Sequence, residues 1–223
     1  NTLVTFRILE AMRVNSIKEI YFASTGSVYG EHSTFPTPEN ASFPVQTSLY
    51  GASKLACEGL ISAYAEGYGF KATIFRFVSI LGGRYTHGHV FDFIRSLKAD
   101  STKLKVLGNG FQSKSYLHVN DCIGAICCVL QSNWAKSGTS IYNLGVDGTI
   151  TVRESASIIC ECMGLDPEFY FEQGKRGWIG DSPLIILDTT KIRALGWDPA
   201  LSIESSIKDT VEYLLSNDWL FEL

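Results

Sequence analysis

A tyrosine and a lysine, Tyr50 and Lys54, lie four residues apart near the start of a segment that favours a helix. Residues four apart project from the same face of a helix, so the lysine ammonium can lie near the tyrosine phenol. A nearby positive charge favours the phenolate, which can remove a proton from an alcohol. Because such a pair is more often an ordinary surface pair, it indicates a general base only together with other residues.

Small hydroxyl residues follow a short apolar run that we expect to form a buried strand at 20–24. Ser24, Thr25 and Ser27 therefore lie at or just beyond the carboxyl end of this strand. Open α/β sheets bind their ligands at that end of their parallel strands. A hydroxyl group there can reach the same pocket as Tyr50.

The elements expected around these residues follow the order of an α/β fold. A strand at 20–24, a helix at 49–68 with Ser48 as its N-cap, and a strand at 72–78 form a crossover unit of a parallel sheet. An amphipathic helix near residues 3–14 precedes them. The other expected helices are 90–98, 121–130, 151–163 with a capping box at Thr151 and Glu154, and 202–215, and the other expected strands are 104–107, 115–119, 140–144 and 168–171.

Composition excludes several classes of protein. With 45% hydrophobic and 19% charged residues, the 223-residue chain can bury a sizeable core and is not disordered. A net charge of −4 disfavours broad contact with a nucleic-acid backbone. No apolar run is long enough to span a membrane, and the first residues do not resemble a secretion signal, so we expect a cytoplasmic protein. The six cysteines lack paired C-x-x-C spacing, and His87 and His89 lack a third ligand nearby, so we expect neither disulfides nor a metal site.

The chain resembles the extended short-chain dehydrogenases/reductases, and within them the nucleotide-sugar epimerases and dehydratases. The resemblance rests on motifs that follow one another in the family's order over nearly the whole chain. They are Ser-Thr-x-x-Val-Tyr-Gly at 24–30, Tyr-x-x-Ser-Lys at 50–54, Arg-Phe-Val-Ser at 76–79, Gly-Asn-Gly-Phe-Gln-Ser-Lys-Ser-Tyr at 108–116, Val-Asn-Asp at 119–121, Asp-Thr-Thr-Lys at 188–191 and Leu-Gly-Trp at 195–197.

The resemblance implies that Thr25, Tyr50 and Lys54 form a catalytic triad and that NAD is the cofactor. Tyr50 would take the proton from a sugar hydroxyl while hydride passes to the nicotinamide ring. Lys54 would hold the nicotinamide ribose, and Thr25 would hydrogen-bond the reacting oxygen. The implied cofactor contacts are Ala23, Ser24, Tyr50, Lys54, Phe77 and Val78.

A nucleotide-sugar substrate is also implied by the resemblance. Arg176 and Lys114 would contact its diphosphate or ribose, because arginine and lysine are the usual phosphate-binding side chains. The chain departs from the family at Lys114, where arginine is usual, at Ser79, where asparagine is frequent, and at Gly83, where proline is frequent. The implied substrate contacts are Thr25, Ser79, His89, Val90, Leu107, Lys114 and Arg176.

The residues after Thr25 separate the possible reactions. The family's dehydratases carry acidic residues there, whereas this chain has Gly26 and Ser27, which cannot transfer the proton needed to eliminate water. Epimerisation at C4 of a UDP-hexose, by transient oxidation to a keto-sugar, is therefore favoured. A nucleotide-sugar reductase or decarboxylase of the same fold, or a non-catalytic member that binds through the cleft, remains an alternative. Relatives commonly pair through helices beside the sheet, so a homodimer is expected.

The expected architecture is the C-terminal part of a doubly wound parallel, Rossmann-like sheet with a smaller α+β substrate-binding region. Residues 1–82 and the returning segment 119–146 would form the partial dinucleotide-binding domain, and 83–118 and 147–223 the substrate-binding region. The Gly-rich turn that binds pyrophosphate is not found in the sequence, and three βαβ units before the first helix would add about 90 residues. We therefore expect a fragment that binds NAD weakly or not at all, that can be inactive through truncation, and that has its strand at 20–24 on a sheet edge.

Overall fold

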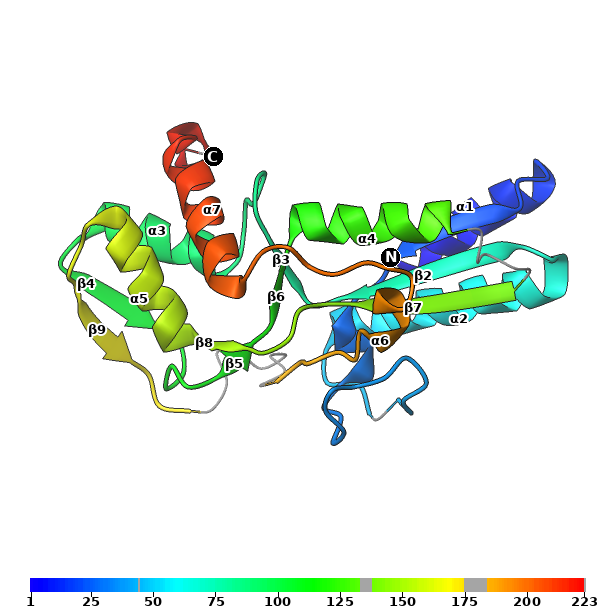
Figure 1. The fold of residues 1–223 in the computed structure, drawn as a ribbon, viewed down its shortest axis with the longest axis horizontal. Helices are drawn as coiled ribbons and strands as arrows, with labels where there is room; N and C mark the ends of the chain where they lie inside the picture. Colours follow the sequence, from blue (N-terminus) through cyan, green and yellow to red (C-terminus); the bar gives the residue numbers. More distant parts are fainter. Residues whose placement is uncertain (44, 133–137, 175–183, 223) are drawn as a thin grey trace. The chain divides into compact units, whose positions relative to one another are not determined.

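The computed structural model describes residues 1–43, 45–132, 138–174 and 184–222, and the chain divides into two units. The first unit consists of residues 1–78, 123–145 and 185–198, and the second of 79–122, 146–184 and 199–223. Their helices and strands are labelled in Figure 1. Helices connect parallel strands, so the expected α/β class is confirmed.

A three-stranded parallel sheet in the order β1-β2-β7 forms the centre of the first unit. Its strands are β1 (Glu19–Ala23), β2 (Lys71–Phe77) and β7 (Gly138–Leu144). Residues 72–76 of the middle strand β2 are all buried, which explains why its sequence is largely apolar and does not alternate. Within the described parts of the chain β1 pairs only with β2, which confirms the expected edge position.

Helices α1 (Thr2–Val14) and α2 (Leu49–Tyr68) pack beside this sheet (Figure 1). Ser48 begins α2 by accepting a hydrogen bond from the Gly51 N–H at 2.9 Å, and Gly69 ends it in the left-handed conformation. Both bounds of α2 agree with the prediction. The two helices and β2 share one apolar core, made of Leu9, Met12, Ile61, Ala65, Phe70, Ala72 and Ile74.

The remaining elements of the first unit lie around the sheet. The short helix η1 (Gly26–Tyr29) follows β1, and α4 (Val119–Gln131) begins in the second unit and continues into the first. Helix α6 (Thr190–Arg193) lies against β7 (Figure 1).

Residues 185–198 belong to the first unit, although the sequence pattern predicted them in the substrate-binding region. Leu187 forms a parallel bridge with Thr37, and Lys191 Nζ donates to the Ile141 carbonyl of β7 at 2.6 Å. These contacts involve backbone groups far away in the sequence, and no local pattern indicates them.

The described residues of the second unit form α3 (His89–Ala99), α5 (Val152–Met163), α7 (Ile203–Leu215) and the short helix η2 (Asp218–Phe221), besides the start of α4. The predicted capping box of α5 is present, with Thr151 and Glu154 exchanging hydrogen bonds. The described residues of this unit also form three strand pairs: β3 (Ser79–Leu81) with β6 (Tyr116–His118), β4 (Lys103–Val106) with β9 (Glu168–Phe171), and β5 (Ser113–Lys114) with β8 (Ile150–Thr151). Its apolar core includes Val90, Ile94, Leu97, Leu104, Ile159 and Val211.

The strand expected at 115–119 corresponds to β6, which pairs parallel with β3. Because Val119 already begins α4, the observed strand is one residue shorter at each end than the expected one. Strand β5 was not predicted. It has only two residues and pairs antiparallel with β8, and the pattern of apolar residues gives no signal for such a short pairing.

Several expectations about single residues can be compared with the structure. All six cysteines are free, and Cys57, Cys122 and Cys160 are buried, whereas Cys127 and Cys162 are exposed and are not core residues. Among the described residues, His, Cys, Asp and Glu side chains form no group of three that could hold a metal ion. In the same residues, no helix is both long and apolar enough to cross a membrane.

Candidate active site

The predicted hydroxyl residues lie at the carboxyl end of β1. Ser24 N–H donates to the Phe75 carbonyl at 2.7 Å, so the pairing with β2 continues to this residue. The chain then turns at Thr25 into η1, and Thr25 Oγ1 accepts a hydrogen bond from Ser27 N–H at 3.1 Å. The Thr25 hydroxyl also donates to Ser27 Oγ at 3.2 Å. This N-cap arrangement holds the Thr25 side chain at the end of the sheet.

Helix α2 brings Lys54 to the same strand end. Lys54 Nζ donates to the Ala23 carbonyl at 2.7 Å and lies 4.7 Å from the centre of the Phe22 ring. Tyr50 lies one helical turn earlier, with 50% of its surface exposed. The next residue, Gly51, packs so closely on η1 that a Cβ there would lie 2.7 Å from the Ser27 carbonyl oxygen. The start of α2 is thus held against the turn that follows Thr25.

We expect Gly51→Ala to lower the free energy of unfolding by about 1 to 3 kcal/mol, because the new methyl group overlaps the Ser27 carbonyl oxygen. Urea denaturation measures the change. On the same helix, Gly59→Ala is the matched control, since nothing lies within 4 Å of a Cβ built at Gly59. Alanine should stabilise that position by up to about 1 kcal/mol. An equal gain in both variants would contradict the close packing of α2 on η1.

Four of the six predicted cofactor contacts lie at the ends of two neighbouring strands. Ala23 is exposed and Ser24 is buried at the end of β1. Phe77 is partly exposed at the end of β2, and Val78, which is buried, donates its N–H to the Leu144 carbonyl at 3.1 Å. These residues therefore lie on the same edge of the first unit's sheet, where a parallel sheet binds its ligand.

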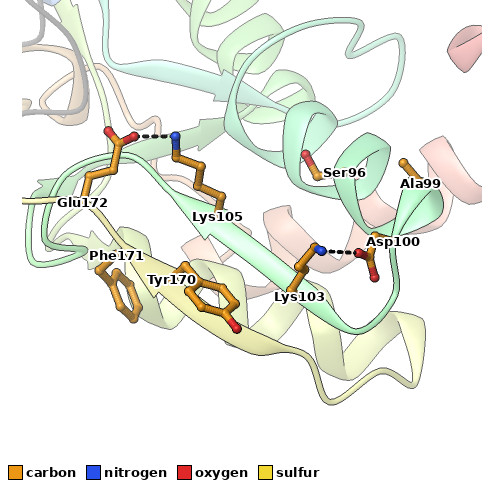
Figure 2. Close-up of a pocket in the computed structure, with 8 residues that line it drawn as sticks. All are labelled: Ser96, Ala99, Asp100, Lys103, Lys105, Tyr170, Phe171 and Glu172. Atoms are coloured by element: carbon orange, nitrogen blue, oxygen red, sulfur yellow. Dashed lines mark ion pairs between the residues drawn. The ribbon is translucent and has the colours of Figure 1, made fainter.

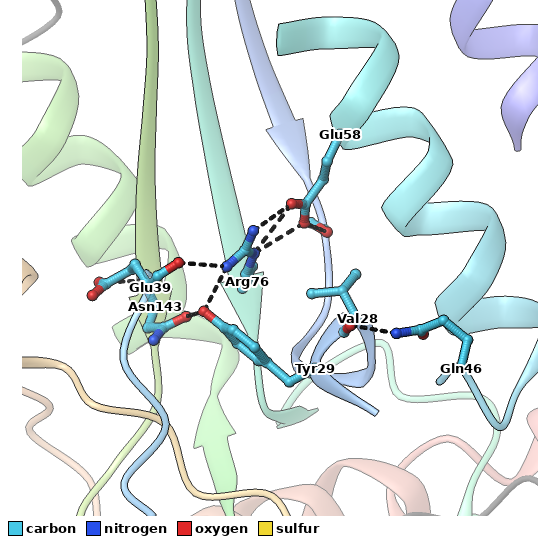
Figure 3. Close-up of polar contacts among 8 residues, drawn as sticks. Val28, Tyr29, Glu39, Gln46, Glu58, Arg76 and Asn143 are labelled. Carbon is cyan, nitrogen blue, oxygen red and sulfur yellow. Dashed lines mark hydrogen bonds and ion pairs between the residues drawn. The ribbon is translucent and has the colours of Figure 1, made fainter. Parts of the chain in front are cut away.

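A buried ion pair between Arg76 and Glu58 lies behind this edge, and sequence reasoning assigned it no role in the site. Arg76, on β2, is 1% exposed, and its Nη2 lies 2.6 Å from Glu58 Oε2 (Figure 3). Burial disfavours the charged guanidinium, but the hydrogen bonds and the charge of Glu58 outweigh this effect, so the pKa of Arg76 is raised. A charged residue in an otherwise apolar strand is the signal for such a pair, because buried charges are nearly always paired.

The ion pair is part of a larger network of hydrogen bonds. Arg76 Nη1 donates to the Tyr29 hydroxyl at 2.6 Å and to the Glu39 carbonyl at 3.0 Å (Figure 3). Tyr29 in turn donates to Asn143 Oδ1 at 2.9 Å, and the Asn143 N–H donates to Glu39 Oε1 at 3.0 Å. Burial raises the pKa of Tyr29, which keeps its hydroxyl protonated and able to donate. The network connects α2, β2, η1 and β7.

The predicted substrate contact His89 is held by other residues of the second unit. Its Nε2 lies 2.7 Å from Ser155 Oγ and its Nδ1 lies 3.2 Å from the Tyr116 hydroxyl. The His89 ring stacks on Tyr116, with 5.0 Å between ring centres. Burial, together with the positive charge of Lys114, lowers the pKa of His89 to about 4. His89 is therefore uncharged at neutral pH.

The other predicted substrate contacts differ in their exposure. Ser79, at the start of β3, is exposed, whereas Val90 is fully buried. Leu107 is 50% exposed, and its carbonyl accepts a hydrogen bond from Gln112 Nε2 at 2.7 Å. Lys114 is partly exposed on β5. Arg176 lies outside the described residues.

Comparison with known proteins agrees with these features. The model of the NAD dependent epimerase/dehydratase family matches residues 1–145. The chain belongs to this family. The family resemblance and the expected NAD dependence are thereby confirmed.

Individual members of the epimerase/dehydratase family match nearly the whole chain. A putative UDP-glucose 4-epimerase of Methanocaldococcus jannaschii is 31% identical over 98% of this chain and 70% of its own length. GDP-mannose 3,5-epimerase 1 of Oryza sativa subsp. indica is 26% identical over 94% of this chain and 56% of its own length. The crystal structure of a UDP-galactose 4-epimerase has a TM-score of 0.89 and 31% identity, over 98% of this chain and 70% of that chain. The expected Rossmann-like fold is thus confirmed.

A hollow in the second unit of this epimerase/dehydratase family member is lined by none of the predicted site residues (Figure 2). Two lysines line it, but both are paired with carboxylates. Lys103 Nζ lies 3.0 Å from Asp100 and Lys105 Nζ lies 2.6 Å from Glu172. Hydrogen bonds from Thr102 and Lys103 lower the pKa of Asp100 to about 2, so this carboxylate stays charged. The pairing makes the hollow a poor site for a phosphate group.

Proposed function

We propose that the protein is a NAD-dependent epimerase that inverts C4 of a UDP-hexose. The observation that carries this proposal is the placement of Thr25 and Lys54 at one end of β1, with Tyr50 one turn before Lys54 on α2. Similarity to proteins described as UDP-glucose and UDP-galactose 4-epimerases supports the choice of UDP-hexose. The chain is also similar to a GDP-mannose 3,5-epimerase, which has a different nucleotide and sugar in its name, so the identity of both is tested directly below.

In this proposal three side chains act on the sugar and its cofactor. Tyr50 removes the proton of the C4 hydroxyl and later returns it, and Thr25 donates a hydrogen bond to the same oxygen. Lys54 binds the nicotinamide ribose. When bound, NAD would take up hydride from C4 and return it to the opposite face of the rotated keto-sugar.

The strand ends fit the nicotinamide half of NAD. An ammonium group has three N–H donors, and Lys54 gives one of them to the Ala23 carbonyl at 2.7 Å, which leaves donors for the ribose hydroxyls. Ala23, Ser24, Phe77 and Val78, on the adjoining ends of β1 and β2, would line the same part of the cofactor. These assignments remain predictions for mutagenesis.

The surroundings of Gly26 favour epimerisation over dehydration. A Cβ at Gly26 would lie 3.0 Å from Ile185 Cγ2 and 3.2 Å from the Phe77 carbonyl oxygen. An acidic side chain at this position would have to displace these neighbours, and the next residue is Ser27. A second proton donor for the loss of water is therefore not provided by either residue after Thr25.

We also propose that the second unit binds the nucleotide sugar and that the protein is cytoplasmic.

A homodimer that forms through α1 and α2 is a further part of the proposal. Leu3, Val4 and Phe6 of α1 are 60%, 59% and 43% exposed, and exposed apolar side chains of this kind favour association.

A panel of UDP-hexoses tests the proposal. The full-length protein is incubated with NAD and UDP-glucose, UDP-galactose or UDP-glucuronic acid, and the products are separated by chromatography. We expect exchange between C4 epimers with no net change in NADH absorbance. Net use of a reduced cofactor would instead indicate a reductase, and release of CO₂ from UDP-glucuronic acid a decarboxylase. Binding of the sugars without any conversion would favour the non-catalytic alternative.

A further inference from the structure

Two successive turns of α2 hold two successive residues at the end of β1. Lys54 donates to the Ala23 carbonyl at 2.7 Å. Glu58, one turn later and 4% exposed, accepts a hydrogen bond from the hydroxyl of Ser24. Ser24 immediately precedes Thr25, so Glu58 is linked to the proposed reaction site through one residue.

Arg76 fixes the position of Glu58. Its Nε lies 3.1 Å and 3.2 Å from the two carboxylate oxygens, and its Nη2 lies 2.6 Å from Oε2. The same guanidinium holds the Tyr29 hydroxyl at 2.6 Å and lies 4.7 Å from the centre of the Tyr29 ring (Figure 3). Thr25 thus lies between two held residues, Ser24 before it and Tyr29 after it.

Stability alone is a weak explanation for this ion pair. A buried ion pair can often be replaced by apolar side chains of similar volume with no loss of stability, because removing two charges from water is costly. The pair nevertheless lies directly behind the strand end that carries Thr25, and it contacts that end through a specific hydroxyl group. If the ion pair fixes the position of the strand end, both its location behind Thr25 and its hydrogen bond to the Ser24 hydroxyl are explained.

We propose that Glu58, held by Arg76, is a positioning residue that sets the register of α2 against the end of β1, and thereby the placement of Tyr50 and Lys54 relative to Thr25. This inference rests on the proposed function for its effect on the reaction. Its effect on the order of the turn at 24–30 does not depend on that function.

Two variants test the inference. Ser24→Ala removes the hydroxyl that reaches Glu58 and leaves the ion pair intact, whereas Glu58→Gln keeps the shape of the side chain and removes its charge. We expect either variant to lower kcat for the nucleotide sugar by about 10- to 100-fold, with KM changed by less than about twofold, because a displacement near 1 Å costs about 100-fold in rate. The matched control is Ser206→Ala, which removes a buried serine hydroxyl that donates to the Ser202 carbonyl within α7 at 2.8 Å.

Amide hydrogen exchange provides the readout that is independent of activity. The Ser27 N–H donates a hydrogen bond to Thr25 Oγ1 at 3.1 Å, and the Gly30 N–H donates one to the Ser27 carbonyl, also at 3.1 Å. Both amides should exchange about 5- to 10-fold faster in Ser24→Ala and Glu58→Gln, and at an unchanged rate in Ser206→Ala.

The two readouts together decide the inference. Faster exchange with a full kcat overturns it, and so does a lower kcat with unchanged exchange. A rise in KM with kcat intact also overturns it, because that result assigns the residues to binding. If the unmodified full-length protein converts no nucleotide sugar, the proposed function fails, while the exchange rates still decide whether Glu58 orders the turn.

Discussion

Tyr50→Phe is expected to lower the rate of C4 epimerisation by about 100- to 10,000-fold, the range typical of losing a general acid–base group. The substitution removes only the phenol oxygen, and the Tyr50 side chain is half exposed, so folding and nucleotide-sugar binding should be retained. Product formation from the preferred UDP-hexose measures the rate, and calorimetric titration with the same sugar measures binding.

Tyr68→Phe is the matched control for this experiment. Tyr68 is the last residue of the same helix, α2, and is 49% exposed. Its replacement should leave the rate unchanged within about twofold, the scatter expected of a surface substitution. Full activity in Tyr50→Phe would contradict the assignment of Tyr50 as the base and would favour the binding-only alternative.

Arg76→Ala carries the largest expected loss of stability, about 3 to 5 kcal/mol, measured as the change in the free energy of unfolding in urea. The substitution leaves the Glu58 carboxylate buried without its guanidinium partner and removes the donors to the Tyr29 hydroxyl and the Glu39 carbonyl. An unpaired buried charge is among the most costly defects in a protein interior.

Two comparisons separate this effect from the loss of any ion pair. Arg13→Ala breaks an exposed pair with Glu10 on α1 and should hardly move the urea midpoint. In the double variant Arg76→Met with Glu58→Gln, no charge remains buried, so it should be more stable than Arg76→Ala. Equal losses in Arg13→Ala and Arg76→Ala would contradict the argument, as would a double variant less stable than the single one.

The elements that the sequence predicts best have strong local signals. Ser48 and Gly69 mark the two ends of α2, because a serine N-cap and a left-handed glycine act through neighbouring backbone groups. The capping box at Thr151 is predicted for the same reason. By contrast, the unpredicted strand β5 and the return of 185–198 to the first unit depend on pairing with distant segments.

The candidate site likewise contains residues that local sequence signals predict and residues that they do not. Tyr50 and Lys54 are found from their spacing on one helix, and Thr25 from its place after a strand. The role of Arg76 depends on partners 18 positions away at Glu58 and 47 away at Tyr29, and helix or strand periodicity carries no information about such pairs. His89 is another example, since its partner Ser155 lies 66 positions away.

The division of the chain into two units has a practical consequence for redesign. The backbone passes from one unit to the other at 78/79, 122/123, 145/146, 184/185 and 198/199, which makes five crossings. A chimera that exchanges the second unit for that of a relative would therefore need three separate inserts, 79–122, 146–184 and 199–223, joined in frame. One of these junctions falls inside α4, between Cys122 and Ile123, so the helical segment from the relative must continue α4 there without an insertion or deletion.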